Sequence, residues 1–381
     1  MQIIDRYLLR QFVQTFLICF ISLTGLYIVI DAFTNLESFI NCAETTGQSL
    51  GSLMGSYYAY RSLFFFDRTS GMLALIAGMF TITWIQRHNE LTAIMAAGIP
   101  RIRVVKPIIA AAVAITIIAM ANRELVIPGF REELSRSTFD LVGDNAQELQ
   151  PRFDNQTDVL IRGDSTYAAE ERISKPHFQL PGELDAYGNQ LIAKEAIYKP
   201  AQGDRPSGYL LKDVEQPKDI DKLPSLTLPS TGQRVVITPH DEPGWLKPNE
   251  CFLVSNVTFD QLSNSLAWKQ YASTFQLIGS LRNPSLGYGA DMSVAIHSRI
   301  LHPFLDMTLL FLGMPLVLAK GNRNVFAAIG LCILVVSVFV LVTLALQSLG
   351  SNYLLSPALA AWAPLMLFVP AAVGMAGTMW E

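Results

Sequence analysis

Six long apolar runs constrain this chain more than any other feature of its sequence. Each is long enough, or nearly so, to cross a hydrocarbon layer roughly 30 Å thick. Buried helices of a soluble protein are the alternative reading, but six uninterrupted apolar runs of this length argue against it. The sequence therefore predicts six transmembrane helices, in the runs 12–33, 69–85, 104–122, 302–318, 325–346 and 358–379.

A long polar segment separates the third run from the fourth, between Arg123 and His297. It contains short apolar stretches of strand type, such as DVLIRGD, NQLIAKEAIYK, GYLLKDV and CFLVSNVTF, with turn residues between them. Many short strands at regular intervals are typical of a sandwich or a jelly roll. The stretch SNSLAWKQYASTFQLIGSLRNP, which follows them, has a helical pattern. We therefore predict an α-helical membrane protein with an inserted all-β, jelly-roll-like domain, divided into residues 1–122, 123–298 and 299–381.

The basic residues of the short loops predict the orientation in the membrane. Lys and Arg are absent from two loops, 34–56 and 347–357. They occur near the N-terminus and in the loops 86–106 and 319–324, at Arg6, Arg10, Arg87, Arg101, Arg103, Lys106, Lys320 and Arg323. Because cytoplasmic loops carry an excess of Lys and Arg, both termini are predicted to be cytoplasmic and the large insert to lie outside.

Composition and motifs exclude several classes of protein. With 16% charged residues and a net charge of −4, the chain lacks the basic footprint of a nucleic-acid-binding protein. It contains no phosphate-binding loop, no HExxH motif and no GxSxG motif, so we expect no catalytic residues, no metal and no cofactor. The four cysteines include no CxxC pair. Whether Cys42 and Cys251 meet cannot be derived from sequence.

Ionisable residues in or beside the apolar runs are the candidate substrate or gate residues. Asp306 lies inside the fourth run, four residues after His302, so the two side chains can pair on one helical face. Arg299 and Asp31 lie near the outer edge of the membrane, where they could face a lipid headgroup or simply reach the interface. The second run extends back towards Tyr57 and carries charges that can neutralise one another, Arg61, Asp67 and Arg68.

The segment RHNELTAIMAAGIPRIR, residues 87–103, predicts a short helix in the loop between the second and third runs. Asn89 is a suitable N-cap, Glu90 suits the positive end of the helix dipole, and Gly98 is a natural C-terminal stop. Three apolar residues share one face, Leu91, Ile94 and Met95. Such a helix can dock into a groove of a soluble partner, or it can pack against the protein's own helices. The residues alone favour neither reading.

Several of these segments, in the same order, resemble the LptF/LptG permease family (YjgP/YjgQ type), the membrane subunits of the lipopolysaccharide-export ABC transporter. IIDRYLLRQF is similar to the family's first helix, and NELTAIMAAGIPRIRV to its cytoplasmic signature. IAKEAIYKP and YLLKDV resemble phrases of its outer jelly roll. IHSRILHPFLDMTLLFLGMPL with KGNRN, and LSPALAAWAPLMLF, resemble its fourth and sixth spans.

The resemblance implies a mechanism in the bacterial inner membrane. Two such permeases pair, LptB-like ABC ATPases bind below them, and the cavity between them takes up lipopolysaccharide, which passes to an LptC/LptA-like periplasmic bridge. Runs 12–33 and 325–346 would face the partner permease. The implied ATPase contacts, in a coupling helix near 89–98, are Arg87, Glu90, Leu91, Ile94, Met95, Ala97 and Gly98. The resemblance leaves open whether the chain is F-like or G-like, and whether it forms a hetero- or homodimer.

Two other functions are compatible with these features. One is a permease of another ABC exporter, which would move lipoprotein or a different amphiphile. The other is a membrane-anchored binding or sensor module whose insert recognises a ligand and whose loop signals. A membrane enzyme ranks third, because no catalytic groups cluster in the sequence.

Overall fold

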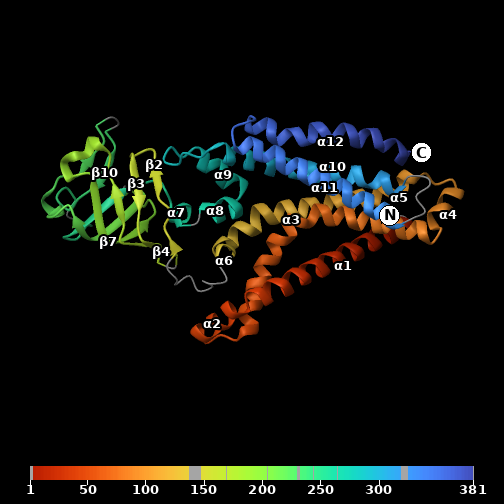
Figure 1. Cartoon of the computed structure of the whole chain (residues 1–381), viewed down its shortest axis with the longest axis horizontal. Helices are drawn as coiled ribbons and strands as arrows, with labels where there is room; N and C mark the ends of the chain where they lie inside the picture. The colour runs from red at the N-terminus through yellow and green to blue at the C-terminus, as the bar shows by residue number, and fades with distance from the viewer. Residues whose placement is uncertain are drawn as a thin grey trace. The chain divides into compact units, whose positions relative to one another are not determined.

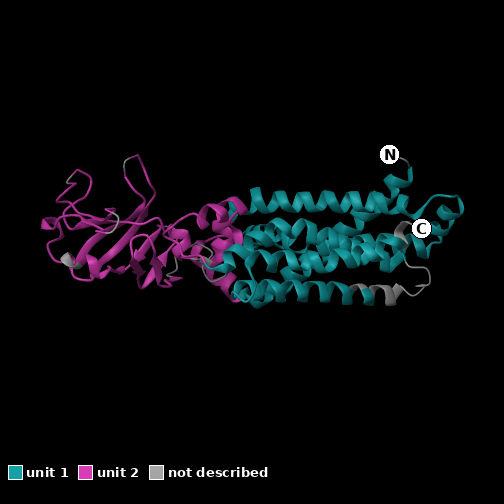
Figure 2. Cartoon of the chain, turned by 90° about the horizontal axis from the view of Figure 1, so that it is seen from above, with its two compact units in different colours: residues 1–36, 51–130, 289–381 teal, residues 37–50, 131–288 magenta. Residues whose placement is uncertain are grey.

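A computed structural model gives the fold of the chain (Figure 1). It describes residues 3–136, 147–168, 170–203, 205–229, 232–242, 244–263, 265–318 and 325–380. Lys320 and Arg323, two of the basic loop residues, lie outside the described residues. The chain forms two compact units (Figure 2). The helical unit comprises Met1–Leu36, Gly51–Phe130 and Gly289–Glu381, and the β unit comprises Glu37–Leu50 and Arg131–Tyr288.

The helical unit contains the predicted apolar runs as helices that lie alongside one another (Figure 1). In the described part of the chain, six helices are long and apolar enough to cross a membrane, so the predicted number is confirmed. The second is much longer than its apolar run, because it includes the aromatic segment around Tyr57. The elements are α1 (Ile3–Thr34), α3 (Leu50–Arg87), α4 (Glu90–Ala96), α5 (Arg101–Ala121), α10 (Ala290–Leu318), α11 (Val325–Ser351) and α12 (Pro357–Trp380).

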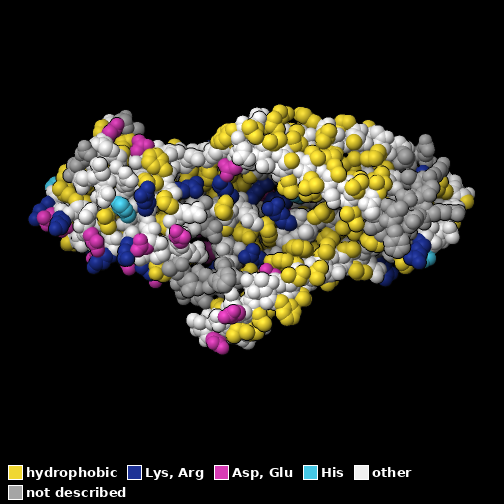
Figure 3. Space-filling view, in the orientation of Figure 1, with side chains coloured by type: hydrophobic (Ala, Val, Ile, Leu, Met, Phe, Trp, Pro, Cys, Tyr) yellow, Lys and Arg dark blue, Asp and Glu magenta, His cyan; other side chains and the backbone are white. Residues whose placement is uncertain are grey.

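The core of the helical unit lies where α3, α5 and α10 meet, with the first turns of α1 packed against them. Close approach depends on glycine: a Cβ on Gly313 would lie 2.3 Å from Leu75 Cδ1. Burial is uneven, since 50% and 56% of the apolar stretches of α3 and α10 are buried, but only 11% of those of α1 and α11. The outer surface of these helices is accordingly largely hydrophobic (Figure 3). Hydrocarbon lipid or another apolar surface must cover it.

The third span does not end as a regular α-helix. After α5 the chain forms a π-helical turn, η1 (Asn122–Val126), and then a 3-10 turn, η2 (Ile127–Phe130). Such π-helical turns inside longer helices are rare and are frequently found at functional sites. Here the turn carries Arg123, whose contacts are described below.

The β unit contains an antiparallel sheet in which every strand pairing is antiparallel, which confirms the predicted all-β insert. The two longest strands, β7 (Gln190–Lys199) and β8 (Gly208–Gln216), pair at its centre. Along β7 one edge pairs first with β6 and then with β5, so the sheet branches there. The remaining strands are β1 (Gln147–Glu148), β2 (Arg152–Asp154), β3 (Val159–Arg162), β4 (Ser165–Tyr167), β5 (Arg172–Ser174), β6 (His177–Gln179), β9 (Leu226–Thr227), β10 (Arg234–Ile237) and β11 (Glu250–Val254).

Apolar and polar side chains alternate along the strands, and the apolar ones form a closed core in the β unit. Phe178, Tyr209 and Leu211 are fully buried in it. Cys251 is also fully buried and is a free thiol, so it is not bonded to Cys42. Burial raises the pKa of the Cys251 thiol, which is the behaviour of an ordinary packing residue.

Short helices complete the β unit. The predicted helical stretch after the strands is confirmed as two helices, α8 (Ser265–Tyr271) and α9 (Thr274–Leu281). Ser273 and Gln276 form a capping box at the start of α9, which satisfies two backbone donors. The other helical segments are α2 (Leu36–Thr46), α6 (Arg131–Ser135), η3 (Gly182–Tyr187), η4 (Ile220–Lys222) and α7 (Phe259–Ser263).

Candidate functional site

The predicted loop helix is α4, and its start differs from the prediction. Asn89 occupies the N-cap position, but its side chain makes no cap hydrogen bond and its φ is 58°. The predicted side-chain capping by Asn89 is therefore wrong, because a residue in the left-handed conformation does not aim its side chain at the first turn. The Glu90 carboxylate does lie in the first turn, where it accepts a 3.4 Å hydrogen bond from the Tyr7 hydroxyl of α1.

The end of α4 is as predicted. Gly98 has a φ of 76°, and its N–H donates to the Met95 carbonyl at 2.9 Å. The N–H of Ile99 donates to the Ile94 carbonyl at 3.2 Å. These two bonds form a Schellman motif, which requires a left-handed residue and so favours glycine at this position.

The two faces of α4 have different surroundings. Leu91 is buried, and Ile94 and Met95 pack against the core of the helical unit. The apolar face therefore lies on the protein's own helices. The opposite face is exposed and carries small side chains, at Thr92, Ala93, Ala96, Ala97 and Gly98, with Arg87 exposed just before the helix. We call these five residues the small-residue face.

A second group of candidate residues lies inside the helical unit. Asp67 of α3 and Arg123 of η1 form a buried ion pair, with Arg123 Nε 2.9 and 3.0 Å from the two carboxylate oxygens. The sequence suggested instead that Asp67 is neutralised by its neighbours on α3. Those arginines lie over aromatic rings, Arg61 over Tyr57 and Arg68 over Phe64.

His302 and Asp306 of α10 pair as their spacing predicts, with His302 Nδ1 3.2 Å from a carboxylate oxygen. Gly71 of α3 makes room for this carboxylate, since a Cβ there would lie 2.1 Å from Asp306 Oδ1. A small cavity of about 20 Å³ joins both pairs. We call its charged and polar lining the polar cluster: Asp67, Ser70, Thr116, Arg123, Glu124, Arg299, His302 and Asp306.

The structure thus brings together three of the four candidate substrate or gate residues. Arg299, His302 and Asp306 lie in the polar cluster, whereas Asp31 accepts a 2.9 Å hydrogen bond from the Tyr58 hydroxyl and links α1 to α3. Sequence reasoning missed Arg123. The sequence offered Asp67 two nearer partners, Arg61 and Arg68, so nothing in it pointed to Arg123 at the end of the third run.

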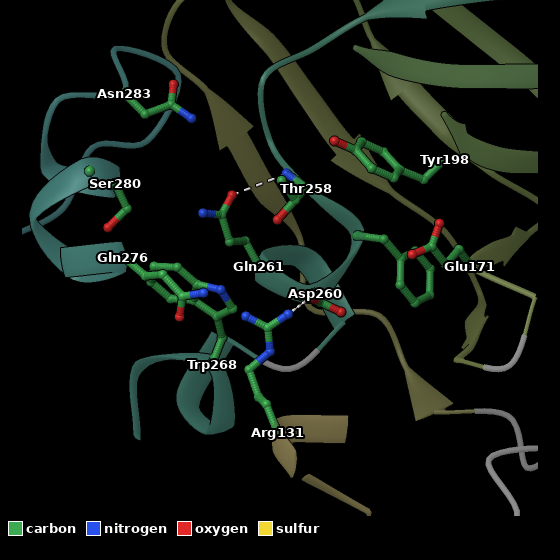
Figure 4. A pocket seen from close by; sticks show the side chains of 12 residues that line it. Arg131, Glu171, Tyr198, Thr258, Asp260, Gln261, Trp268, Gln276, Ser280 and Asn283 are labelled. Carbon is green, nitrogen blue, oxygen red and sulfur yellow. Dashed lines mark hydrogen bonds and ion pairs between the residues drawn. The ribbon is translucent and has the colours of Figure 1, made fainter. Parts of the chain in front are cut away.

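The β unit contains a larger cavity of about 400 Å³ (Figure 4). Five distant segments form its wall: α6, the turn before β5, the end of β7, α7 and the pair α8–α9. Because these segments are far apart in the chain, no sequence motif marks the cavity. Its polar lining is Arg131, Glu171, Tyr198, Thr258, Asp260, Gln261, Trp268, Gln276, Ser280 and Asn283.

Taken together, these features define a polytopic membrane protein with an inserted antiparallel β domain and a short, exposed loop helix. Among the described residues, no group of three or more His, Cys, Asp or Glu side chains could hold a metal ion. The model of the family described as "Lipopolysaccharide export system permease LptF/LptG" matches residues 6–176 and 209–376. The chain therefore belongs to the LptF/LptG permease family, which confirms the resemblance seen in the sequence. No curated protein matches the chain.

Family membership has direct functional consequences. The chain is a multi-pass inner-membrane protein and a lipopolysaccharide-export permease at the family level. Members of the family are non-catalytic membrane subunits of a transporter.

Proposed function

We propose that this chain is one permease subunit of an exporter that extracts lipopolysaccharide from the inner membrane and passes it to a periplasmic bridge protein. A separate ABC ATPase of LptB type drives it, since the sequence contains no phosphate-binding loop of its own. The observation that carries this proposal is α4: one face is fixed to the helical unit and the other is exposed.

The proposed ATPase contact is the small-residue face of α4, flanked by Arg87 and Glu90. Small side chains leave the backbone accessible, so a groove of the ATPase can approach closely. Leu91, Ile94 and Met95, which the family resemblance also implies as contacts, pack on the bundle. In our proposal these three residues do not contact the ATPase. They transmit its motion from α4 to the helical unit.

The membrane topology that this requires places both termini and α4 in the cytoplasm and the β unit in the periplasm. The distribution of Lys and Arg over the short loops supports it. We propose that the periplasmic region comprises residues 123–298 and that the membrane region comprises residues 1–122 and 299–381. With this topology the β unit passes the lipid to an LptC/LptA-like bridge.

The second permease is proposed to cover α1 and α11. Their apolar stretches are only 11% buried within this chain. Residues 12–33 and 325–346 are then the faces that line the lateral gate for the lipid. A lipid-filled cavity between two permeases needs such apolar walls, because the acyl chains replace the missing protein contacts.

The polar cluster is proposed to couple the spans during transport. Asp67, Arg123 and Asp306 tie α3, η1 and α10 to one another through buried contacts. A push on α4 then moves these elements as a rigid body. In this view Arg299 and His302 hold α10 in place beside α3, and Asp31 holds α1 through Tyr58.

Copurification in mild detergent tests the proposal. Thr92→Trp places a large ring on the exposed face of α4 without a strained backbone, unlike a substitution at Gly98, whose φ is 76°. The variant is expected to reach the membrane but to lose the copurifying ATPase. Thr45→Trp, at an exposed position in α2, is the matched control and is expected to keep it. Retention of the ATPase by Thr92→Trp would refute the contact.

A further inference from the structure

The cavity of the β unit has the size and the lining of a ligand-binding site. Its volume of about 400 Å³ lies in the range found for small-molecule pockets. Three of its polar side chains are more than nine-tenths buried, Gln261 and Ser280 at 6% exposed and Trp268 at 7%. Ser280 donates to the Leu277 carbonyl, and the Gln261 oxygen caps the start of α7, whereas Trp268 belongs to none of the ion pairs that hold the surrounding segments.

Gln261 and Trp268 each keep a hydrogen-bond donor from which no described residue accepts. The Gln261 Oε1 atom accepts the Thr258 N–H at 3.0 Å, which leaves the Nε2 group with no partner among the described residues. The Trp268 ring stacks on Tyr288, with centroids 6.2 Å apart and an interplanar angle of 9°. Its Nε1–H likewise has no hydrogen-bond partner in the part of the chain that the structure describes. Neither donor is among the buried side-chain atoms that lack a partner, so each opens into the cavity, where a ligand with acceptor atoms can bind it.

The opposite wall carries an acceptor. Figure 4 shows Glu171 beside Tyr198, across the cavity from the Gln276 and Ser280 side. Glu171 has a left-handed backbone with a φ of 48°, and no hydrogen bond or ion pair joins its carboxylate to another described residue. Although the Glu171 side chain is exposed, partial desolvation and the nearby carboxylates of Asp260 and Glu132 raise the pKa of its carboxyl.

Asp260 differs from Glu171 because it is already paired. Arg131 of α6 donates to its carboxylate, so this ion pair joins α6 to α7 beside the cavity. Glu171 is therefore the acceptor left for a ligand. Because carboxylates crowd this wall, an anionic group such as a phosphate would be repelled.

Donors on one wall and a carboxylate on the other match a ligand whose groups both donate and accept. Hydroxyl groups do this, since each has one donor hydrogen and two acceptor lone pairs. We propose that this cavity binds a neutral saccharide, with its hydroxyls accepting from Gln261 and Trp268 and donating to Glu171. The sugar part of lipopolysaccharide is the source that follows from the proposed function, on which this identification rests; a free saccharide is the other source.

The experiment measures saturation-transfer NMR between the detergent-solubilised full chain and two probes, methyl glucoside and a dephosphorylated, deacylated core oligosaccharide. Trp268→Phe removes only the N–H and keeps the ring, and Gln261→Glu keeps the oxygen that bonds Thr258 but removes the amide donors. Each variant is expected to weaken binding about three- to tenfold, the usual effect of one lost hydrogen bond. Trp245→Phe, outside the cavity, is the matched control and should bind as the unsubstituted chain does. Preference for the core oligosaccharide assigns the glycolipid as source, and preference for the glucoside assigns a free sugar.

Three outcomes would overturn the inference: no transfer to either probe, binding that both variants leave unchanged, or Glu171-dependent binding of a lysine pentapeptide instead of the sugars. A parallel assay distinguishes failure of the saccharide site from failure of the proposed function. If lipopolysaccharide is still extracted from proteoliposomes by the copurified complex while neither sugar binds, only the saccharide site is refuted. If sugar binds but nothing is extracted, the proposed function is refuted instead.

Discussion

In the β unit, Phe178 and Tyr209 are fully buried, whereas in the helical unit Ile21 of α1 and Leu341 of α11 are 67% and 66% exposed. The β unit closes its apolar core within the chain, since the two faces of each strand separate buried from exposed residues. The helical unit does not, because α1 and α11 present apolar side chains to their surroundings. The described residues of the β unit therefore form a closed core of their own, while the helical unit depends on lipid or a second permease to cover its apolar surface.

The largest effect that this comparison predicts follows from deleting a core ring of the β unit. Phe178→Ala is expected to lower the free energy of unfolding by about 3–5 kcal/mol, because the lost burial and the cavity add. Ile21→Ala in α1 is expected to change it by less than about 0.5 kcal/mol, since most of that side chain is already exposed. Thermal unfolding in detergent measures both. Equal losses would contradict the comparison.

Inside the helical unit, a substitution in the polar cluster is expected to lower the free energy of unfolding by nearly as much. Asp67→Ala leaves the Arg123 guanidinium buried without its carboxylate, which costs about 3–5 kcal/mol in comparable pairs. Replacing both residues by alanine removes the uncompensated charge, so part of the stability should return. Unfolding midpoints of the single and double variants measure this. A double variant that is less stable than Asp67→Ala would argue against the pair.

Substitutions of two glycines test the difference in packing between a core helix, α3, and a peripheral helix, α1. Gly71→Ala in α3 brings a methyl group onto the Asp306 carboxylate, and overpacking of this kind costs about 1–3 kcal/mol. Gly25→Ala in α1 has open space around it and should be neutral or stabilising, because alanine favours helix. The same unfolding assay compares them. A stabilised Gly71→Ala variant would contradict the close approach of α3 and α10.

The smallest predicted effect concerns the surface of the β unit. Hydrogen bonds from His240 and Ser225 lower the pKa of Asp241 from its ordinary value of 3.8 to about 2. A carboxylate with a lowered pKa stabilises the folded state above its unfolded pKa and loses that contribution as the pH falls. The loss should therefore occur between pH 3.8 and about pH 2. Asp241→Asn should abolish this part of the pH dependence in an acid titration followed by circular dichroism.

Much of this architecture could be predicted from the sequence. Apolar runs and strand alternation are local patterns, and the chain follows them in both units. The stop at Gly98 and the pairing of His302 with Asp306 were predictable for the same reason, because each depends on neighbours within five residues.

What could not be predicted depends on segments that are distant in the sequence. The ion pair of Asp67 with Arg123 joins two spans, and its geometry follows from a π-helical turn that composition does not signal. The burial of the apolar face of α4 depends on how the loop folds back on the bundle. The cavity around Gln261 and Trp268 needs five segments to be in place, so no single motif marks it.

In the proposed topology α4 faces the cytoplasm, where an ATPase can act on it. Cysteine labelling tests it most directly, in a chain whose four native cysteines are replaced by serine. Thr92→Cys on α4 and Thr45→Cys on α2 are both exposed, and each is treated with a membrane-impermeant maleimide in spheroplasts. Thr45→Cys is expected to react at once, and Thr92→Cys only after the membrane is opened. Reaction of Thr92→Cys in sealed spheroplasts would contradict it.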